Sequence, residues 1–289
     1  MAIQHYEKPT SEAQASALLA SDPTACAFAG GTDILIQERA GTKPVGVMVD
    51  LKHIPGLVGI DWSADAVRIG AATPCVELTG DSRLEELFPG LVEAIELIGS
   101  VQIQARCSVG GNLCNGSPAA DTTPALIVNL ATAVIFGPAG ERQLPVTELT
   151  TGPGTTVLQK GEFLTALTLP LPASNRADAA LRLIPRTEMD IAAANAAVSL
   201  ALDGSGQCQD LRLAIGAVGP KAIRVPDATE QLEGRPLDQH ALDDLAELAR
   251  NAAQPIDDKR GTVEYRRHVI GVLAQRAAVM AKQRAEAGR

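Results

Sequence analysis

The sequence predicts an α+β protein built from two units, and three observations support that fold class. The chain has 289 residues, which is more than one domain usually holds. The run Pro170-Leu171-Pro172, with polar residues after it, is typical of a linker. Before this run short apolar segments alternate with helical patterns, whereas after it strand-like segments precede helical ones. We therefore expect a first unit over residues 1–172 and a second, α+β unit over 173–289.

The first unit begins with a helix and a strand that lead to a pair of glycines. Ser11 and Gln14 form a capping-box pair, which predicts a short helix through Ala20. The apolar run 25–29 predicts a buried strand that ends at Gly30-Gly31. The further elements expected in this unit are helices from Thr32 or Asp33, over 75–87, over 91–98 after a break at Pro89-Gly90, and from Asp121 to Leu130, and strands over 45–51, 67–70, 133–136, 156–158 and 163–169.

The second unit has the pattern of strands followed by helices. Two β-rich runs, 192–202 and 211–218, are separated by Asp203-Gly204-Ser205-Gly206, which is a strong turn signal. Residues 242–249 and 263–281 show helical periodicity. This order predicts a separate α+β module.

Composition excludes several classes of function. Aromatic residues make up 2% of the chain and the formal net charge is −9, so a nucleic-acid surface with stacking rings and a basic face is not expected. No apolar run has the length of a membrane-spanning helix, and residues 1–9 lack the pattern of a signal peptide, so we expect a cytoplasmic location. The five cysteines are scattered and form no CxxC pair, so neither a disulfide frame nor a metal site of usual spacing is indicated. Cys107 and Cys114 flank the second glycine pair and could be functional thiols, but we expect them to be small packing residues.

No familiar catalytic or metal-binding motif is present. The chain has neither a P-loop nor a GxGxxG turn after a strand, and Ser117 lies outside any GxSxG elbow. The four histidines, His5, His53, His240 and His268, lie far apart and are expected at the surface. The sequence therefore predicts no catalytic side chain and no metal site in this chain.

Two glycine pairs carry the functional signal. The first lies in Ala29-Gly30-Gly31-Thr32-Asp33 and the second in Ser108-Val109-Gly110-Gly111-Asn112. We expect each pair to follow a strand-like run and form a turn. Without side chains, backbone amides can approach an anion closely, so two such segments fit two linked phosphates. A single glycine pair is often only a turn, but both together, with their polar followers, favour a dinucleotide site. Asp121 could accept hydrogen bonds from a ribose, or it could be a helix N-cap.

These motifs resemble the FAD-binding subunits of molybdenum hydroxylases. That family includes the medium subunits of aerobic carbon monoxide dehydrogenase, xanthine dehydrogenase-type and 4-hydroxybenzoyl-CoA reductase-type complexes. The run Ser-Pro-Ala-Ala-Asp over 117–121 matches as well, and so do the segments 186–192, 216–224 and 265–267. The resemblance covers essentially the whole chain.

The resemblance implies a fold, a cofactor and partners. The fold is a two-subdomain FAD-binding module of the PCMH or vanillyl-alcohol-oxidase type, with subdomains over about 1–55 and 56–172, followed by an α+β C-terminal domain. Electrons would reach FAD from iron–sulfur clusters of a small, two-cluster partner subunit and pass to an external acceptor. The molybdenum cofactor would lie on a large, molybdopterin-binding subunit. The cysteine-rich insertion of the benzoyl-CoA branch is absent after the second glycine pair, so no iron–sulfur centre is expected in this chain.

The resemblance also assigns residues to the cofactor. Relatives often carry Lys where this chain has Arg182, near the carbonyl end of the flavin, so the role of Arg182 stays open between flavin electrostatics and a surface ion pair. Leu164 matches a position that packs against the isoalloxazine, and its alternative is core packing. The residues implied for the pyrophosphate and the ribose are Ala29, Gly30, Gly31, Thr32, Asp33, Ile34, Ser108, Gly110, Gly111, Asn112 and Asp121.

Three alternatives remain at this point. The chain could be a stand-alone FAD-dependent oxidoreductase with its own substrate site, although no clear set of acid–base groups is visible. It could be an assembly subunit without flavin, which the intact glycines disfavour. The third alternative is an unrelated module that binds ATP or NAD.

Overall fold

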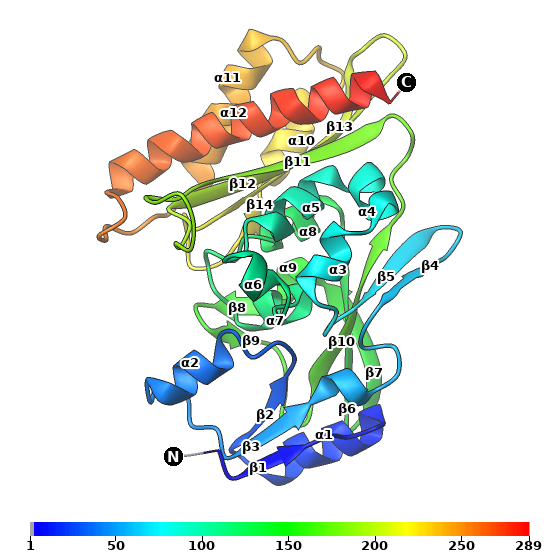
Figure 1. Ribbon diagram of the computed structural model, residues 1–289. Helices are drawn as coiled ribbons and strands as arrows, with labels where there is room; N and C mark the ends of the chain where they lie inside the picture. The colour runs from blue at the N-terminus through cyan, green and yellow to red at the C-terminus, as the bar shows by residue number, and fades with distance from the viewer. Residues whose placement is uncertain (1–2, 289) are drawn as a thin grey trace.

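The computed structural model describes residues 3–288, whose strands form three larger sheets with helices packed on their faces (Figure 1). The N-terminal sheet is parallel and has the order β1 (His5–Glu7), β3 (Val47–Asp50), β2 (Ala25–Phe28). Helix α1 (Glu12–Ser21) begins where predicted, because the Ser11 side chain accepts the Gln14 amide. The chain leaves β2 through the first glycine pair and enters α2 (Ile34–Arg39). These predictions are confirmed, except that β2 is an edge strand and only half-buried.

The middle sheet is antiparallel and has five strands in the order β4 (Ile60–Trp62), β5 (Ala66–Gly70), β10 (Phe163–Pro170), β6 (Thr132–Gly137), β7 (Gly140–Pro145). Helices connect β5 to β6: α3 (Cys75–Thr79), α4 (Ser82–Leu87), α5 (Pro89–Glu96), α6 (Val101–Gln104), α7 (Val109–Cys114) and α8 (Thr123–Val128). After β7 come α9 (Val146–Leu149) and the small pair β8 (Thr150–Gly152) and β9 (Thr155–Thr156). Apolar side chains from these helices and from β5, β6 and β10 form one core. Cys107 belongs to it and Cys114 packs against it, so the packing role expected of both is confirmed.

The C-terminal unit packs its helices on one antiparallel sheet of four strands. The sheet order is β11 (Arg176–Leu183), β12 (Ala194–Leu202), β13 (Cys208–Gly216), β14 (Ile223–Arg224). Three helices follow: α10 (Pro226–Leu232), α11 (Gln239–Ala252) and α12 (Val263–Ala287). Every residue of β12 is buried, because α12 covers one face of the sheet and α5 and α8 of the middle unit approach the other (Figure 1). The predicted hairpin and both predicted helices are confirmed.

Four expectations were wrong, and two strands were missed. Residues 75–87 form two short helices, α3 and α4, instead of one. The expected break before the next helix exists but lies at Phe88, because Pro89 suits the first position of α5, where its missing N–H is not needed. Strands β7 and β11 have too little apolar alternation to be recognised, because charged residues also occupy covered positions, such as the half-buried Arg142 in β7 and the buried Asp178 in β11. Residues 156–158 contribute only Thr156 to a strand. The second glycine pair lies in helix α7 rather than in a turn after a strand.

Polar contacts join the C-terminal unit to the middle one. The buried Asp178 carboxylate accepts the Gly90 amide at 2.8 Å and the Asn129 side-chain amide at 2.6 Å. Arg284, near the end of α12, donates to the Asp178 carbonyl at 2.8 Å and pairs with Glu93 on α5. Within residues 3–288 no helix is long and apolar enough to cross a membrane.

Candidate functional site

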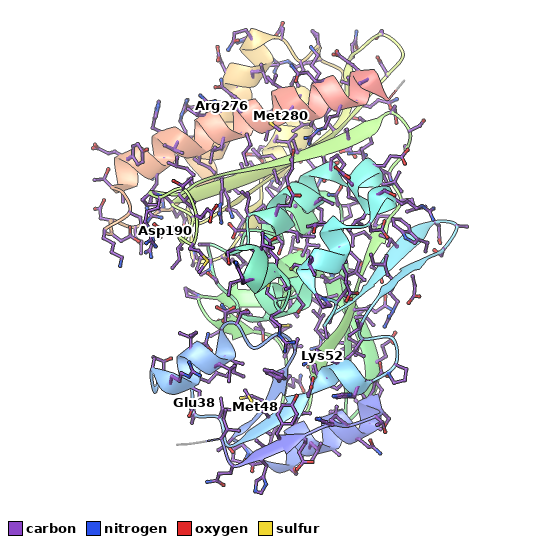
Figure 2. All side chains as sticks on the ribbon, viewed as in Figure 1. Glu38, Met48, Lys52, Asp190, Arg276 and Met280 are labelled. Carbon is purple, nitrogen blue, oxygen red and sulfur yellow. The ribbon has the colours of Figure 1, made fainter. Side chains whose placement is uncertain are left out.

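A cleft of about 460 Å³ lies where the N-terminal, middle and C-terminal sheets with their helices meet. Its walls come from the first glycine segment and α2, from the loops around α6 and α7, from residues 117–121, and from the loop between β11 and β12. Asp190 marks that last loop in Figure 2, on the same side of the molecule as Glu38 of α2. The predicted residues that line the cleft are Ala29, Gly30, Gly31, Thr32, Asp33, Ile34, Ser108, Gly111, Asn112 and Asp121.

The two glycine segments are packed directly against each other. A Cβ atom on Gly30 would lie 1.9 Å from the carbonyl oxygen of Arg106, in the segment that leads into α7. Gly31 has a φ of +80°, a left-handed conformation that side chains disfavour, and a Cβ there would meet the Phe28 ring at 2.4 Å. Glycine is therefore required at both positions, once for close approach and once for the turn.

The first segment presents a row of backbone amides without protein partners. In the described part of the chain, no acceptor takes a hydrogen bond from the amides of residues 30–34, whereas the amides of Leu35 and Gln37 donate to the carbonyls of Gly31 and Asp33. Asp33 occupies the N-cap position but makes no side-chain cap bond, and burial raises its pKa. Amides that share a concave turn and lack acceptors are suited to an anion.

The second segment works differently from the prediction. Ser108 is the N-cap of α7: its hydroxyl accepts the Gly111 amide at 3.0 Å and its carbonyl accepts the Asn112 amide at 2.9 Å. Those two amides are therefore engaged within the protein. The Asn112 Oδ1 atom accepts the Thr122 hydroxyl at 2.7 Å, which leaves its NH₂ group as the donor at the cleft wall. The serine cap preceding a glycine pair was the signal for a helix, because Ser is a preferred N-cap.

The glycines of this second pair have different surroundings. A Cβ on Gly110 would lie 2.4 Å from the Ala71 carbonyl oxygen, so this residue holds α7 against the middle sheet and stays outside the cleft. A Cβ on Gly111 would meet only the Ser108 hydroxyl, at 3.1 Å, and would otherwise project into open space at the cleft wall. Gly110 therefore serves packing, whereas Gly111 keeps the cleft free.

Asp121 lies in the cleft wall as one half of a buried ion pair. Its Oδ2 atom accepts from Arg182 at 3.0 Å, while its Oδ1 atom is buried without a partner among residues 3–288. Burial raises the pKa of Asp121 to about 6, and Arg182 opposes that shift. The N-cap alternative is wrong, because Thr122 occupies that position and Asp121 caps nothing. A buried acceptor without a donor points to a ligand hydroxyl or amide.

Two further predicted residues do not reach the cleft surface. The Arg182 side chain on β11 is almost fully buried and bonds to Asp121 from behind the cleft wall. The expected ion pair is therefore present, but it does not lie at the surface. Leu164 on β10 pairs with Ile135 of β6 and belongs to the middle core, 3% exposed. Both residues support the cleft wall in this structure instead of forming its surface.

Several cleft residues had not been singled out. Gln37 of α2 donates to the Asn115 Oδ1 atom at 2.8 Å and so ties α2 to the end of α7. Met189 has a left-handed φ of 55° and lies at the cleft with Asp190 and Ile191. The segment 186–192 did carry part of the family resemblance, but nothing in its pattern indicated that it would fold back over the glycine segments. All four histidines are exposed, as expected.

Comparison with known proteins identifies the family. The family described as the FAD binding domain in molybdopterin dehydrogenase matches residues 1–172, and the CO dehydrogenase flavoprotein C-terminal domain matches residues 179–281. The chain is 34% identical to the xanthine dehydrogenase FAD-binding subunit of Escherichia coli O157:H7, covering 94% of this chain and 93% of that one. It is 35% identical to the carbon monoxide dehydrogenase medium chain of Afipia carboxidovorans, covering 97% of both.

A solved structure agrees over the same length. Reconstituted CO dehydrogenase from Oligotropha carboxidovorans contains a chain that matches with a TM-score of 0.93 and 33% identity, covering 98% of this chain and 99% of that one. The predicted two-domain FAD-binding fold and the predicted resemblance are thereby confirmed. The chain belongs to the family of FAD-binding flavoprotein subunits of molybdopterin dehydrogenases.

Proposed function

We propose that this chain is the FAD-carrying electron-transfer subunit of a multi-subunit molybdenum hydroxylase. It receives electrons from iron–sulfur clusters on a small partner subunit and passes them to an external acceptor. The molybdenum cofactor and the organic substrate belong to a large partner subunit. The observation that carries the proposal is the row of unpartnered amides over residues 30–34, in a cleft that a second glycine segment closes. The names of the relatives, a medium chain and a FAD-binding subunit, support an assembly of several subunits.

The cleft residues fit FAD by three independent features. Amides without acceptors suit the two linked phosphates. The unpartnered Oδ1 atom of Asp121 suits a ribose or ribityl hydroxyl, which is a donor. The open space at Gly111 leaves room that any side chain would fill. Bound FAD supplies one- and two-electron redox chemistry at this site.

The residues of the chain bind and orient the cofactor. We propose that the amides of residues 29–34, the Thr32 hydroxyl and the Asn112 NH₂ group hold the pyrophosphate, with Ser108 and Gly110 keeping α7 in position. Asp121 binds the ribose side and Arg182 neutralises it from behind. The contact between Leu164 and the isoalloxazine stays a prediction, and so do the two units over 1–172 and 173–289 and the cytoplasmic location.

The stand-alone oxidoreductase requires catalytic acid–base groups at the same cleft. None of the four histidines lines it, Asp121 is paired with Arg182, and Asp190 is paired with Arg186. Asp33, the one cleft carboxylate without an ion pair among residues 3–288, lies in the glycine segment assigned to the diphosphate. These observations favour the electron-transfer subunit. The sequence also left open an assembly subunit without flavin. This alternative conflicts with the amides of residues 30–34, because backbone amides that make no hydrogen bond within the protein require an acceptor from outside it.

The proposal is tested by purifying the chain with and without its neighbours. The chain is produced alone and together with the molybdopterin-binding and ferredoxin-like subunits that co-purify with it from its native host. We expect a yellow protein with flavin absorbance in both cases, and flavin reduction by organic substrate only in the complex. A well-folded chain that stays colourless with excess FAD refutes cofactor binding. Reduction of the isolated chain by an organic substrate refutes the subunit role and favours the stand-alone enzyme.

A further inference from the structure

Lys52 approaches the first glycine segment from the side opposite the cleft. It lies in the short 3₁₀ helix η1 (Leu51–His53), directly after β3, and Figure 2 marks its position. Its Nζ atom donates to the Ala29 carbonyl oxygen at 2.7 Å and to the Asp50 carboxylate at 2.5 Å. The ammonium also lies 4.3 Å from the centroid of the Phe28 ring. Neither Lys52 nor Asp50 lines the cleft.

The carbonyl that Lys52 holds belongs to the peptide unit that begins the row of free amides. The bond between Ala29 and Gly30 is trans, as no cis peptide occurs in residues 3–288. In a trans peptide the C=O and the following N–H point in opposite directions. A donor that holds the Ala29 oxygen on one side therefore directs the Gly30 amide to the other, and Ala29 and Gly30 both line the cleft.

A second contact supports the turn that follows. The Phe28 ring, under the Lys52 ammonium, is the group that a Cβ on Gly31 would strike at 2.4 Å. The ring thus lies between the ammonium and the left-handed turn at Gly31. One lysine side chain therefore acts on both glycines through their neighbours. It donates to the Ala29 carbonyl of the Ala29–Gly30 peptide, and it makes a cation–π contact with the Phe28 ring that packs against Gly31.

The ammonium itself is fixed by a rigid carboxylate. Asp50 is 1% exposed, and its other oxygen accepts the Tyr6 hydroxyl. Burial alone would raise the pKa of Asp50, but the bonds from Lys52 and Tyr6 outweigh it and hold that pKa below its usual value. The Asp50 carboxylate, 2.5 Å from the Lys52 ammonium, compensates its charge, so the direct attraction between Lys52 and a phosphate is small. The main effect of Lys52 on phosphate binding is therefore to orient the Ala29–Gly30 peptide.

We propose that Lys52 is a positioning residue for the FAD diphosphate, acting through the Ala29–Gly30 peptide and Phe28 without touching the cofactor. The inference rests on the proposed function, since it names what orients the amides that bind FAD. It predicts that loss of Lys52 weakens recognition of the diphosphate and leaves recognition of adenine unchanged.

The test compares three variants of the full chain. Lys52→Met removes the donor at similar length, and Lys52→Arg restores a cationic donor. Lys8→Met is the matched control, because Lys8 also lies over an aromatic ring, Tyr6, with its Nζ atom 5.5 Å from the ring centroid, and it is exposed away from the cleft. Dissociation constants for FAD are measured by flavin fluorescence, and ADP and adenosine are titrated as competitors. The melting temperature of each apo chain is recorded alongside.

We expect Lys52→Met to weaken FAD and ADP binding about tenfold, because the misdirected Gly30 amide loses one charge-assisted hydrogen bond to the diphosphate, and to leave adenosine affinity unchanged. Lys52→Arg recovers most of the loss, and Lys8→Met behaves as wild type. Equal FAD affinity in Lys52→Met and wild type overturns the proposal. So does an equal loss for ADP and adenosine together with a lower apo melting temperature, which is the signature of a structural residue. A wild-type chain that binds no FAD refutes the proposed function, and with it this role of Lys52.

Discussion

Gly111→Ala separates cofactor binding from folding. The added Cβ meets one non-neighbouring atom, the Ser108 hydroxyl at 3.1 Å, and otherwise points into the open space of the cleft. Gly111 lies inside α7, where alanine is favoured over glycine by about 1 kcal/mol. The Ser108 hydroxyl has to move by a few tenths of an ångström. We therefore expect the apo chain to be as stable as wild type or more stable by up to about 1 kcal/mol.

The same change should weaken FAD binding. A methyl group in the cleft wall prevents the close approach of backbone and ligand, and overpacking of this kind costs about 1–3 kcal/mol. That corresponds to a rise in the dissociation constant of about fivefold to 150-fold. Stability and affinity then change in opposite directions, which a general loss of structure cannot produce.

Gly30→Ala provides the contrast. Its Cβ would lie 1.9 Å from the Arg106 carbonyl oxygen and 2.9 Å from the Cys107 Cα atom, both of them backbone atoms that cannot rotate away. The two glycine segments must separate by more than ~1 Å, so both stability and FAD affinity are expected to fall, stability by about 1–3 kcal/mol. Gly204→Ala serves as a control, because nothing lies within 4 Å of a Cβ there.

The assay combines urea denaturation of the apo chain with fluorescence titration of FAD for all three variants. Wild-type FAD affinity in Gly111→Ala would refute the assignment of this cleft to the cofactor. If Gly111→Ala lowered the free energy of unfolding as much as Gly30→Ala, the conclusion that a Cβ atom on Gly111 points into open space would be refuted. Reduced affinity in Gly204→Ala would show that the titration reports general damage.

Three other predictions concern charged groups. Arg182→Met should lower the free energy of unfolding, measured by urea denaturation, by about 3 kcal/mol, because Asp121 is left buried without its partner. The same variant should lower the midpoint potential of bound flavin. An unchanged potential would remove the proposed role of Arg182. Burial raises the pKa values of Asp121 and Asp178 to about 6, so the folded chain binds these protons more tightly than the unfolded chain. The stability that these two carboxyl groups contribute is complete below about pH 4 and is lost as the pH rises through about 6. The urea midpoint should therefore increase when the pH is lowered from 7 to 5, and a decrease over that range would contradict this. Arg284→Met removes the contact of α12 with Glu93 on α5 and should lower the free energy of unfolding, again measured in urea, by about 1–2 kcal/mol. An unchanged value would show that apolar contacts alone join the C-terminal unit to the middle one.

Local signals in the sequence determined the elements near the site. The Ser11 cap, the glycine pair after β2 and the turn at residues 203–206 each act within a few residues, so the pattern is sufficient to predict them. The family resemblance was equally accessible, because it depends on motifs that are contiguous in the chain. Strands β7 and β11 were missed, since charged residues at covered positions, Arg142 and Asp178 among them, hide the alternation of a strand.

The sequence by itself determined that two glycine segments, with a short polar run after the second, are equipped to hold a dinucleotide. Only the tertiary structure decided which atoms remain available for it. Ser108 engages two of the predicted amides, Arg182 reaches Asp121 across 61 residues of chain, and Lys52 fixes the peptide that begins the free row. The reason is that a hydrogen bond between residues far apart in sequence leaves no trace in local pattern, whereas a turn or a cap is formed by neighbours.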